Sequence, residues 1–112
     1  MVFLEVCAYN IQSCLIAEKA GAGRIELCAD PAAGGTTPSS GLIEYALQHI
    51  AIPVFPMIRP RGGNFVYDIH ELAIMQKDIQ LCKDAGCKGI ATGVHLPGGR
   101  IDTEHLKRIV EW

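Results

Sequence analysis

The sequence predicts an α/β fold built from about four parallel βα units. Short apolar segments typical of strands alternate four times with helix-like segments, without interruption. The first two strand segments, Phe3–Cys7 and Arg24–Cys28, are near copies, each ending in the pattern apolar, Glu, apolar, Cys. Strands that alternate with helices pair in parallel, because each helix carries the chain back to the start of the next strand.

Start and stop signals justify the individual elements. Asn10 can cap the first helix, and Asp68 with Glu71 three residues later has the pattern of a capping box. Gly86 is expected to end that third helix. Pro56 lies inside the third strand segment, so a bulge or a locally unpaired stretch is expected there, since Pro cannot donate a ladder hydrogen bond. We expect strands at residues 2–8, 24–28, 53–59 and 89–94, helices at about 11–20, 38–49, 68–85 and 102–112, and a loop rich in Gly and Pro at 29–37.

Alternate residues of the first two strands are polar, which is unusual for a plain core. Because side chains alternate between the faces of a strand, Glu5 and Cys7 share one face, and Glu26 and Cys28 share that face of the next strand. Polar side chains at the carboxyl ends of parallel strands are typical of the mouth of a TIM barrel. We therefore expect a partial TIM (β/α)8 barrel that occupies residues 1–112 as one domain. A whole barrel takes roughly 250 residues, so the chain is expected to be a fragment, a truncated product or a self-associating half.

Composition limits the classes of function. The 112 residues are 49% hydrophobic and carry a net charge of −2 with dispersed Lys and Arg, which does not favour nucleic-acid binding. No apolar run reaches the ~18 residues of a membrane span, and no signal-peptide pattern is seen. The five cysteines lack the spacing of a disulfide framework, so we expect reduced thiols and a cytoplasmic location. Cys14, Cys82 and Cys87 are expected to pack in or beside helices.

Cys7 and Cys28 are the candidate metal ligands. They end neighbouring strands, which lie roughly 4.8 Å apart, so two thiols at matched depth could face one metal ion. Thiolate sulfur is a soft ligand that suits Cu(I), and Met57 could add a thioether. The alternative is that each free cysteine is simply a small buried hydrophobe.

A second set of candidates is charged: Glu5, Glu26, Arg59 and Arg61. Buried carboxylates need partners, and Arg59 on the third strand is the expected partner of Glu26. One interpretation is a pocket for a small anionic ligand or substrate, with a carboxylate as acid or base. The other is a structural ion-pair network, and the sequence does not decide whether the protein is an enzyme. His95 follows the fourth strand at the same end and is a further candidate ligand or base.

Taken together, these segments resemble the CutC family of copper-homeostasis proteins. The matching segments run in order along nearly the whole chain: Leu4–Cys7, Arg24–Cys28, Gly34–Ser39, Met57–Gly63, Met75–Asp78 and a stretch from Gly93 through Gly99 to Asp102. The resemblance implies a TIM barrel whose second half is missing here, a cytoplasmic location and an association with copper. It points to Cys7 and Cys28 as Cu(I) ligands. A barrel enzyme acting on an unidentified small anionic substrate is the competing interpretation.

Overall fold

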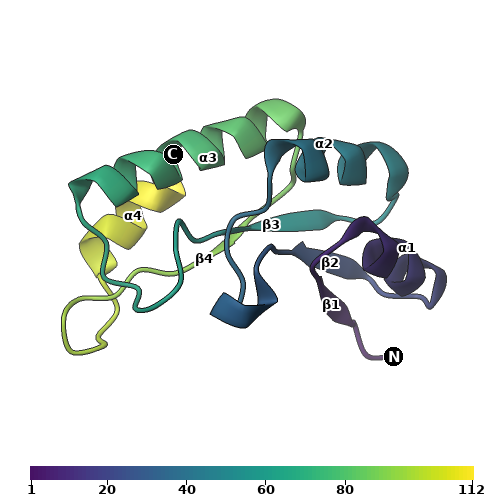
Figure 1. Cartoon of the computed structure of the whole chain (residues 1–112), viewed down its shortest axis with the longest axis horizontal. Helices are drawn as coiled ribbons and strands as arrows, with labels where there is room; N and C mark the ends of the chain where they lie inside the picture. Colours follow the sequence, from purple (N-terminus) through teal and green to yellow (C-terminus); the bar gives the residue numbers. More distant parts are fainter.

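The computed structural model describes all of residues 1–112 and contains one four-stranded sheet with four α-helices. The strands pair in parallel in the order β1-β2-β3-β4, as expected. Helices α1, α2 and α3 cover one face of the sheet, and α4 lies beside α3 (Figure 1). The elements are β1 Glu5–Ala8, α1 Ile11–Lys19, β2 Arg24–Leu27, the short 3₁₀ helix η1 Pro31–Ala33, α2 Ser40–His49, β3 Val54–Ile58, α3 Ile69–Ala85, β4 Ala91–Thr92 and α4 Thr103–Glu111.

The predicted helix caps are confirmed. The Asn10 side chain accepts a hydrogen bond from the Ser13 N–H at 2.7 Å. At the start of α3, the Glu71 N–H donates to Asp68 and the Asp68 N–H donates to Glu71, both at 2.8 Å, which completes the capping box. Gly86 ends α3 with a φ of 91°, a left-handed conformation that favours glycine.

The two edge strands are shorter than expected. β1 begins at Glu5 rather than residue 2, and β4 contains only Ala91 and Thr92. An edge strand has a hydrogen-bonding partner on one side only, so its ends are weakly held. Phe3 and Leu4 accordingly lie exposed before β1, and Gly89 and Gly93 flank β4, where the absence of a side chain weakens a strand.

Pro56 is accommodated without a bulge. It stays in register with Leu27 of β2. The Ile25 N–H donates to the Pro53 carbonyl. Because the backbone groups of successive residues face opposite neighbouring strands, the nitrogen and carbonyl of Pro56 face away from β2. On that other side, pairing with β4 begins only at Met57. Pro56 therefore lacks its N–H at a position where β3 and β4 are not yet hydrogen-bonded. The locally unpaired stretch is limited to the β4 side of β3.

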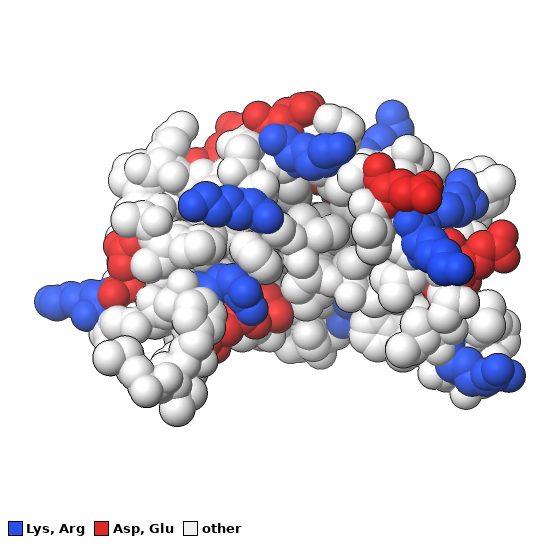
Figure 2. Space-filling view, turned by 180° about the vertical axis from the view of Figure 1, so that it is seen from behind, with Lys and Arg blue, Asp and Glu red and all other residues white.

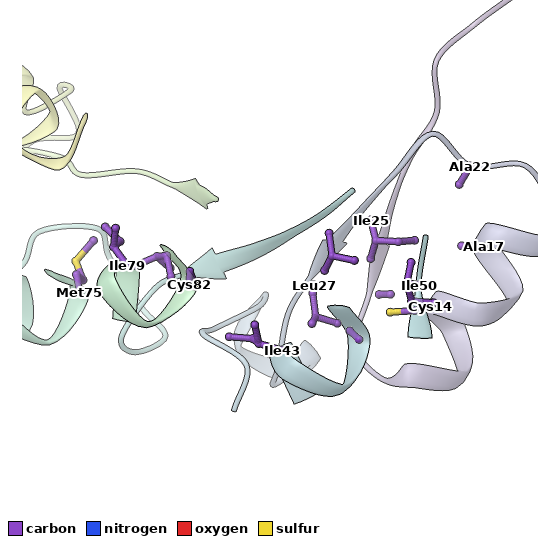
Figure 3. Close-up of a cluster of buried hydrophobic side chains, with 14 of the residues drawn as sticks. Cys14, Ala17, Ala22, Ile25, Leu27, Ile43, Ile50, Met75, Ile79 and Cys82 are labelled. Atoms are coloured by element: carbon purple, nitrogen blue, oxygen red, sulfur yellow. The ribbon is translucent and has the colours of Figure 1, made fainter. Parts of the chain in front are cut away.

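The core lies between the sheet and the helices (Figure 3). Ile25, Leu27 and Ile58 of the sheet are at most 1% exposed. Fully burying such a side chain stabilises a protein by about 1.5–3 kcal/mol, so this layer supplies much of the stability of the fold. Cys14 and Cys82 are 0% and 1% exposed within this layer, which confirms that they pack as small apolar side chains.

The opposite face of the sheet carries the polar residues of the strands. Charged side chains of both signs are interspersed over the rear of the molecule, with large uncharged areas between them (Figure 2). None of the helices combines the length and apolar character that crossing a membrane requires. This side of the molecule therefore presents no extended surface of a single charge.

Candidate metal centre

Strand pairing determines how the polar residues meet. Cys7 lies opposite Glu26 in the β1–β2 register, and Cys28 follows the end of β2. The two cysteines therefore do not share a register level as expected, since Cys28 is one side-chain level further along. Their sulfur atoms nevertheless approach to 3.7 Å.

Glu26 completes a group of three metal-ligand side chains. The ligand atoms of Cys7, Glu26 and Cys28 all lie within 4.8 Å of one another. The Cys28 thiol donates to a Glu26 carboxylate oxygen at 3.6 Å. We had expected Glu26 to pair with Arg59 instead, because the register that sets Glu26 beside Cys7 cannot be read from one sequence.

Burial and neighbouring acids keep the Cys28 thiol protonated. Burial is the main cause that raises its pKa far above the ordinary range, and the hydrogen bond and charge of Cys7 and the charge of Glu26 act in the same direction. The salt bridges of the structure do not include Glu26. The group thus gathers two thiols and a carboxylate without a cationic side chain paired to them, which is an environment that favours a bound cation.

Tyr9 and Gly35 border the thiols and were not predicted. A hydrogen bond with Cys7 is the main cause that raises the pKa of Tyr9. Tyr9 continues the alternation of Glu5 and Cys7, and this pattern was the signal that could have found it. Gly35 has a φ of 100°, and a Cβ atom there would lie 3.4 Å from the Cys28 sulfur and 3.8 Å from the Tyr9 hydroxyl. The loop backbone therefore passes close to the Cys28 thiol at a position whose conformation favours glycine.

Arg59 binds the 29–37 loop and does not pair with Glu26, so the predicted ion pair is wrong. Its guanidinium donates to the carbonyls of Ala33 at 2.6 Å and Gly35 at 2.9 Å, and to that of Gly63 at 2.8 Å. The physical reason is that the 29–37 loop folds back against β3, where its free carbonyls match the fork of donors on an arginine.

The Arg59 backbone adds to this attachment. The Arg59 N–H donates to the Thr37 hydroxyl at 2.9 Å, and the Thr37 N–H donates to the Arg59 carbonyl at 3.0 Å. Arg59 is only 8% exposed. It acts through Gly35 on the surroundings of Cys28 and makes no hydrogen bond to the thiols themselves.

The other charged candidates have separate partners. Glu5 pairs with Arg24, whose guanidinium lies over the Phe55 ring, 4.5 Å from its centroid. Arg61 pairs with Glu71 at 2.6 Å. The structure therefore does not gather Glu5, Glu26, Arg59 and Arg61 into a single pocket.

Two further candidates lie near the mouth of the sheet. Phe55 is opposite Glu26 in the β2–β3 register, so alternation places Met57 on the same face, one level further along, beside Cys28. The His95 ring instead lies against Phe65, with the ring centroids 5.1 Å apart. Met57 is thus positioned as a neighbour of the thiols, and His95 belongs to the aromatic contacts of the loops.

The fold and this site together define a class of protein: part of a TIM-barrel-like α/β protein with thiol and carboxylate side chains gathered at the carboxyl ends of adjacent parallel strands. More particularly, the chain belongs to the CutC family, whose model matches residues 2–112. The predicted resemblance and the predicted fold are both confirmed.

Named relatives agree with this assignment. The chain is 46% identical over 110 residues to a family protein CutC from Salmonella paratyphi A, covering 98% of this chain and 44% of that protein. A family protein CutC from Salmonella typhi matches at the same identity, with 42% of its length covered. The crystal structure of a Streptococcus agalactiae protein, named as a copper homeostasis protein CutC, superimposes with a TM-score of 0.92 at 40% identity, covering 99% of this chain and 54% of that one. The chain therefore spans about half the length of the relatives it matches.

Proposed function

We propose that this chain is the N-terminal half of a cytoplasmic copper-homeostasis barrel and that it binds Cu(I) as cargo through Cys7 and Cys28. The observation that carries the proposal is the 3.7 Å separation of the two sulfur atoms. With metal–thiolate bonds of roughly 2.3 Å, sulfurs at this spacing subtend an angle of about 107° at a shared ion. One ion can therefore contact both thiolates without movement of the strands, and soft sulfur ligands select Cu(I).

Glu26 assists by accepting a proton. Thiolates rather than thiols ligate metals, so Cys28 must lose its proton when Cu(I) arrives. Its thiol already donates to the Glu26 carboxylate, which provides the first acceptor on the way to solvent. Met57 supplies a thioether on the same face as a further soft ligand.

The half-barrel assignment fits the uncovered sheet face. Cys7 and Glu5 lie exposed on the face that the helices leave open, and β1 and β4 each have a free edge. Either the remaining half of the barrel or a second copy of the chain would cover this face.

A pocket for a small anionic substrate receives less support from the geometry. Such a pocket needs arginine donors that are free to bind a ligand. Arg59 instead directs its guanidinium nitrogens to three loop carbonyls, and Arg61 is held by Glu71. The favoured interpretation is therefore that Arg59 positions the loop beside a metal site.

The first test is copper K-edge X-ray absorption on the chain loaded with one equivalent of Cu(I) without oxygen. We expect the two thiolate sulfurs at roughly 2.3 Å, with a third sulfur scatterer if Met57 also binds, and the same spectrum after Cys14, Cys82 and Cys87 are all replaced by serine. A first shell of nitrogen and oxygen alone would contradict the proposal.

The second test is the pH dependence of Cu(I) affinity. Because the raised pKa keeps the Cys28 thiol protonated through neutral pH, binding must release its proton, and affinity should rise as the pH rises. One released proton corresponds to about tenfold per pH unit. We expect a tenfold or steeper increase per unit between pH 6 and 8, with affinity lost as the pH falls. An affinity independent of pH would show that Cys28 is not a ligand.

A further inference from the structure

The end of α3 holds a second pair of cysteines, apart from the proposed copper site. Gly86 follows α3 in the left-handed conformation, and its N–H donates to the Lys83 carbonyl at 3.0 Å. The Cys87 N–H reaches back to the Cys82 carbonyl at 2.9 Å. These two bonds form a Schellman motif, in which the side chains at the positions of Cys82 and Cys87 characteristically contact one another. The turn therefore brings the two side chains close together, and each thiol affects the pKa of the other.

The thiols of this pair differ in access and in acidity. Cys82 is 1% exposed, whereas Cys87 is partly exposed. Burial is the main cause that raises the pKa of Cys82 to about 12. Burial also raises the pKa of Cys87, but a hydrogen bond from Cys82 opposes that rise. Cys87 is thus the accessible thiol, and Cys82 is the buried one.

A hollow of about 330 Å³ opens onto both cysteines, and Lys83 and Lys88 also line it. The two exposed ammonium groups attract an anion to this hollow, while the negative charge of Asp78 acts on the buried Cys82. The lysines distinguish this pair from the proposed copper site, where the carboxylate of Glu26 lies beside the thiols.

We propose that Cys82 and Cys87 form a redox-active dithiol that closes to an intramolecular disulfide on reaction with an anionic small-molecule disulfide. The Cys87 thiolate, its proton released to solvent, attacks one sulfur of the oxidant, breaks its S–S bond and expels one thiolate. Cys82 then loses its proton and attacks the Cys87 sulfur of the mixed disulfide, expelling the second thiolate. The two protein thiols are oxidised by two electrons, and the oxidant is reduced to two thiols.

The Cys7–Cys28 pair is less suited to this reaction, although its sulfurs lie 3.7 Å apart. Cys7 pairs with Glu26, so Cys28 is its diagonal neighbour on the next strand. Diagonal neighbours on adjacent strands are roughly 7–8 Å apart at Cα, beyond the usual span of a disulfide. The Cys82–Cys87 backbones, in contrast, are already joined by a hydrogen bond.

The test is incubation of the whole chain with oxidised glutathione, followed by thiol blocking, trypsin digestion and mass spectrometry. Cleavage after Lys77, Lys83 and Lys88 places each cysteine in its own peptide, 78–83 and 84–88. We expect these two peptides to be joined by a disulfide. In Cys82→Ser, glutathione should stay attached to peptide 84–88, whereas in Cys87→Ser the buried Cys82 should react at least tenfold more slowly than Cys87 does.

A matched pair of oxidants tests the role of charge. Replacing Lys83 and Lys88 with glutamine should slow oxidation by glutathione disulfide several-fold and leave oxidation by uncharged hydroxyethyl disulfide unchanged, with the loss of free thiols followed directly because this variant lacks the two tryptic sites. A disulfide that joins Cys7 to Cys28 instead, or the absence of a glutathione adduct on Cys87 in Cys82→Ser, would overturn the proposal. Both outcomes are independent of whether the chain binds copper.

Discussion

Replacing Arg59 with methionine should lower the free energy of unfolding by about 3 kcal/mol, because three hydrogen bonds from a charged donor are lost together. The carbonyls of Ala33, Gly35 and Gly63 would then lose the guanidinium that now binds them. Methionine fills much of the same volume, so the change removes donors rather than packing. The backbone bonds between residues 37 and 59 do not need the side chain, so the strand itself should persist.

Urea denaturation and amide hydrogen exchange measure this effect. In Arg59→Met we expect the urea concentration at the midpoint of unfolding to fall. The amides of the 29–37 loop should be the first to lose protection from hydrogen exchange. Arg100→Met is the matched control, because Arg100 is exposed and its side chain makes no hydrogen bond or salt bridge; its stability should be unchanged. An Arg59→Met protein with wild-type stability and wild-type loop protection would remove Arg59 from this role.

Local patterns predicted most of the fold. The capping box at Asp68 and Glu71 and the stop at Gly86 depend on a few consecutive residues, so the sequence alone specifies them. Strand alternation likewise placed Cys7 and Glu26 on the face away from the helices. These features are determined by neighbours along the chain.

The errors concern contacts between distant segments. Glu26 and Cys28 share a face because they are two residues apart, but Glu26 meets Cys7 only because of the β1–β2 register. A shift of that register by two residues would keep every side chain on its face and change every cross-strand partner. Arg59 donates to loop carbonyls rather than to Glu26, because the 29–37 loop folds back on β3. Neither the register nor a loop path is encoded in spacing, so the candidate residues were identified but their partners were not.

The proposed copper site predicts complete loss of one binding event when both strand cysteines are removed. Replacing Cys7 and Cys28 with serine keeps the size of the side chains but removes the soft ligands. Glu26 would remain, and a carboxylate alone is a poor ligand for Cu(I). The matched control replaces Cys14, Cys82 and Cys87 with serine, which removes more thiols but none from the site.

The most direct measurement is an anaerobic competition titration of Cu(I) against a chromogenic chelator, on this chain and on its two cysteine variants. Circular dichroism should first show that each variant is folded. We expect one equivalent of tightly bound Cu(I) in the wild type and in the triple variant, and none in Cys7→Ser with Cys28→Ser. Unchanged binding in that double variant, or binding lost only in the triple variant, would contradict the proposal that these two strands hold copper.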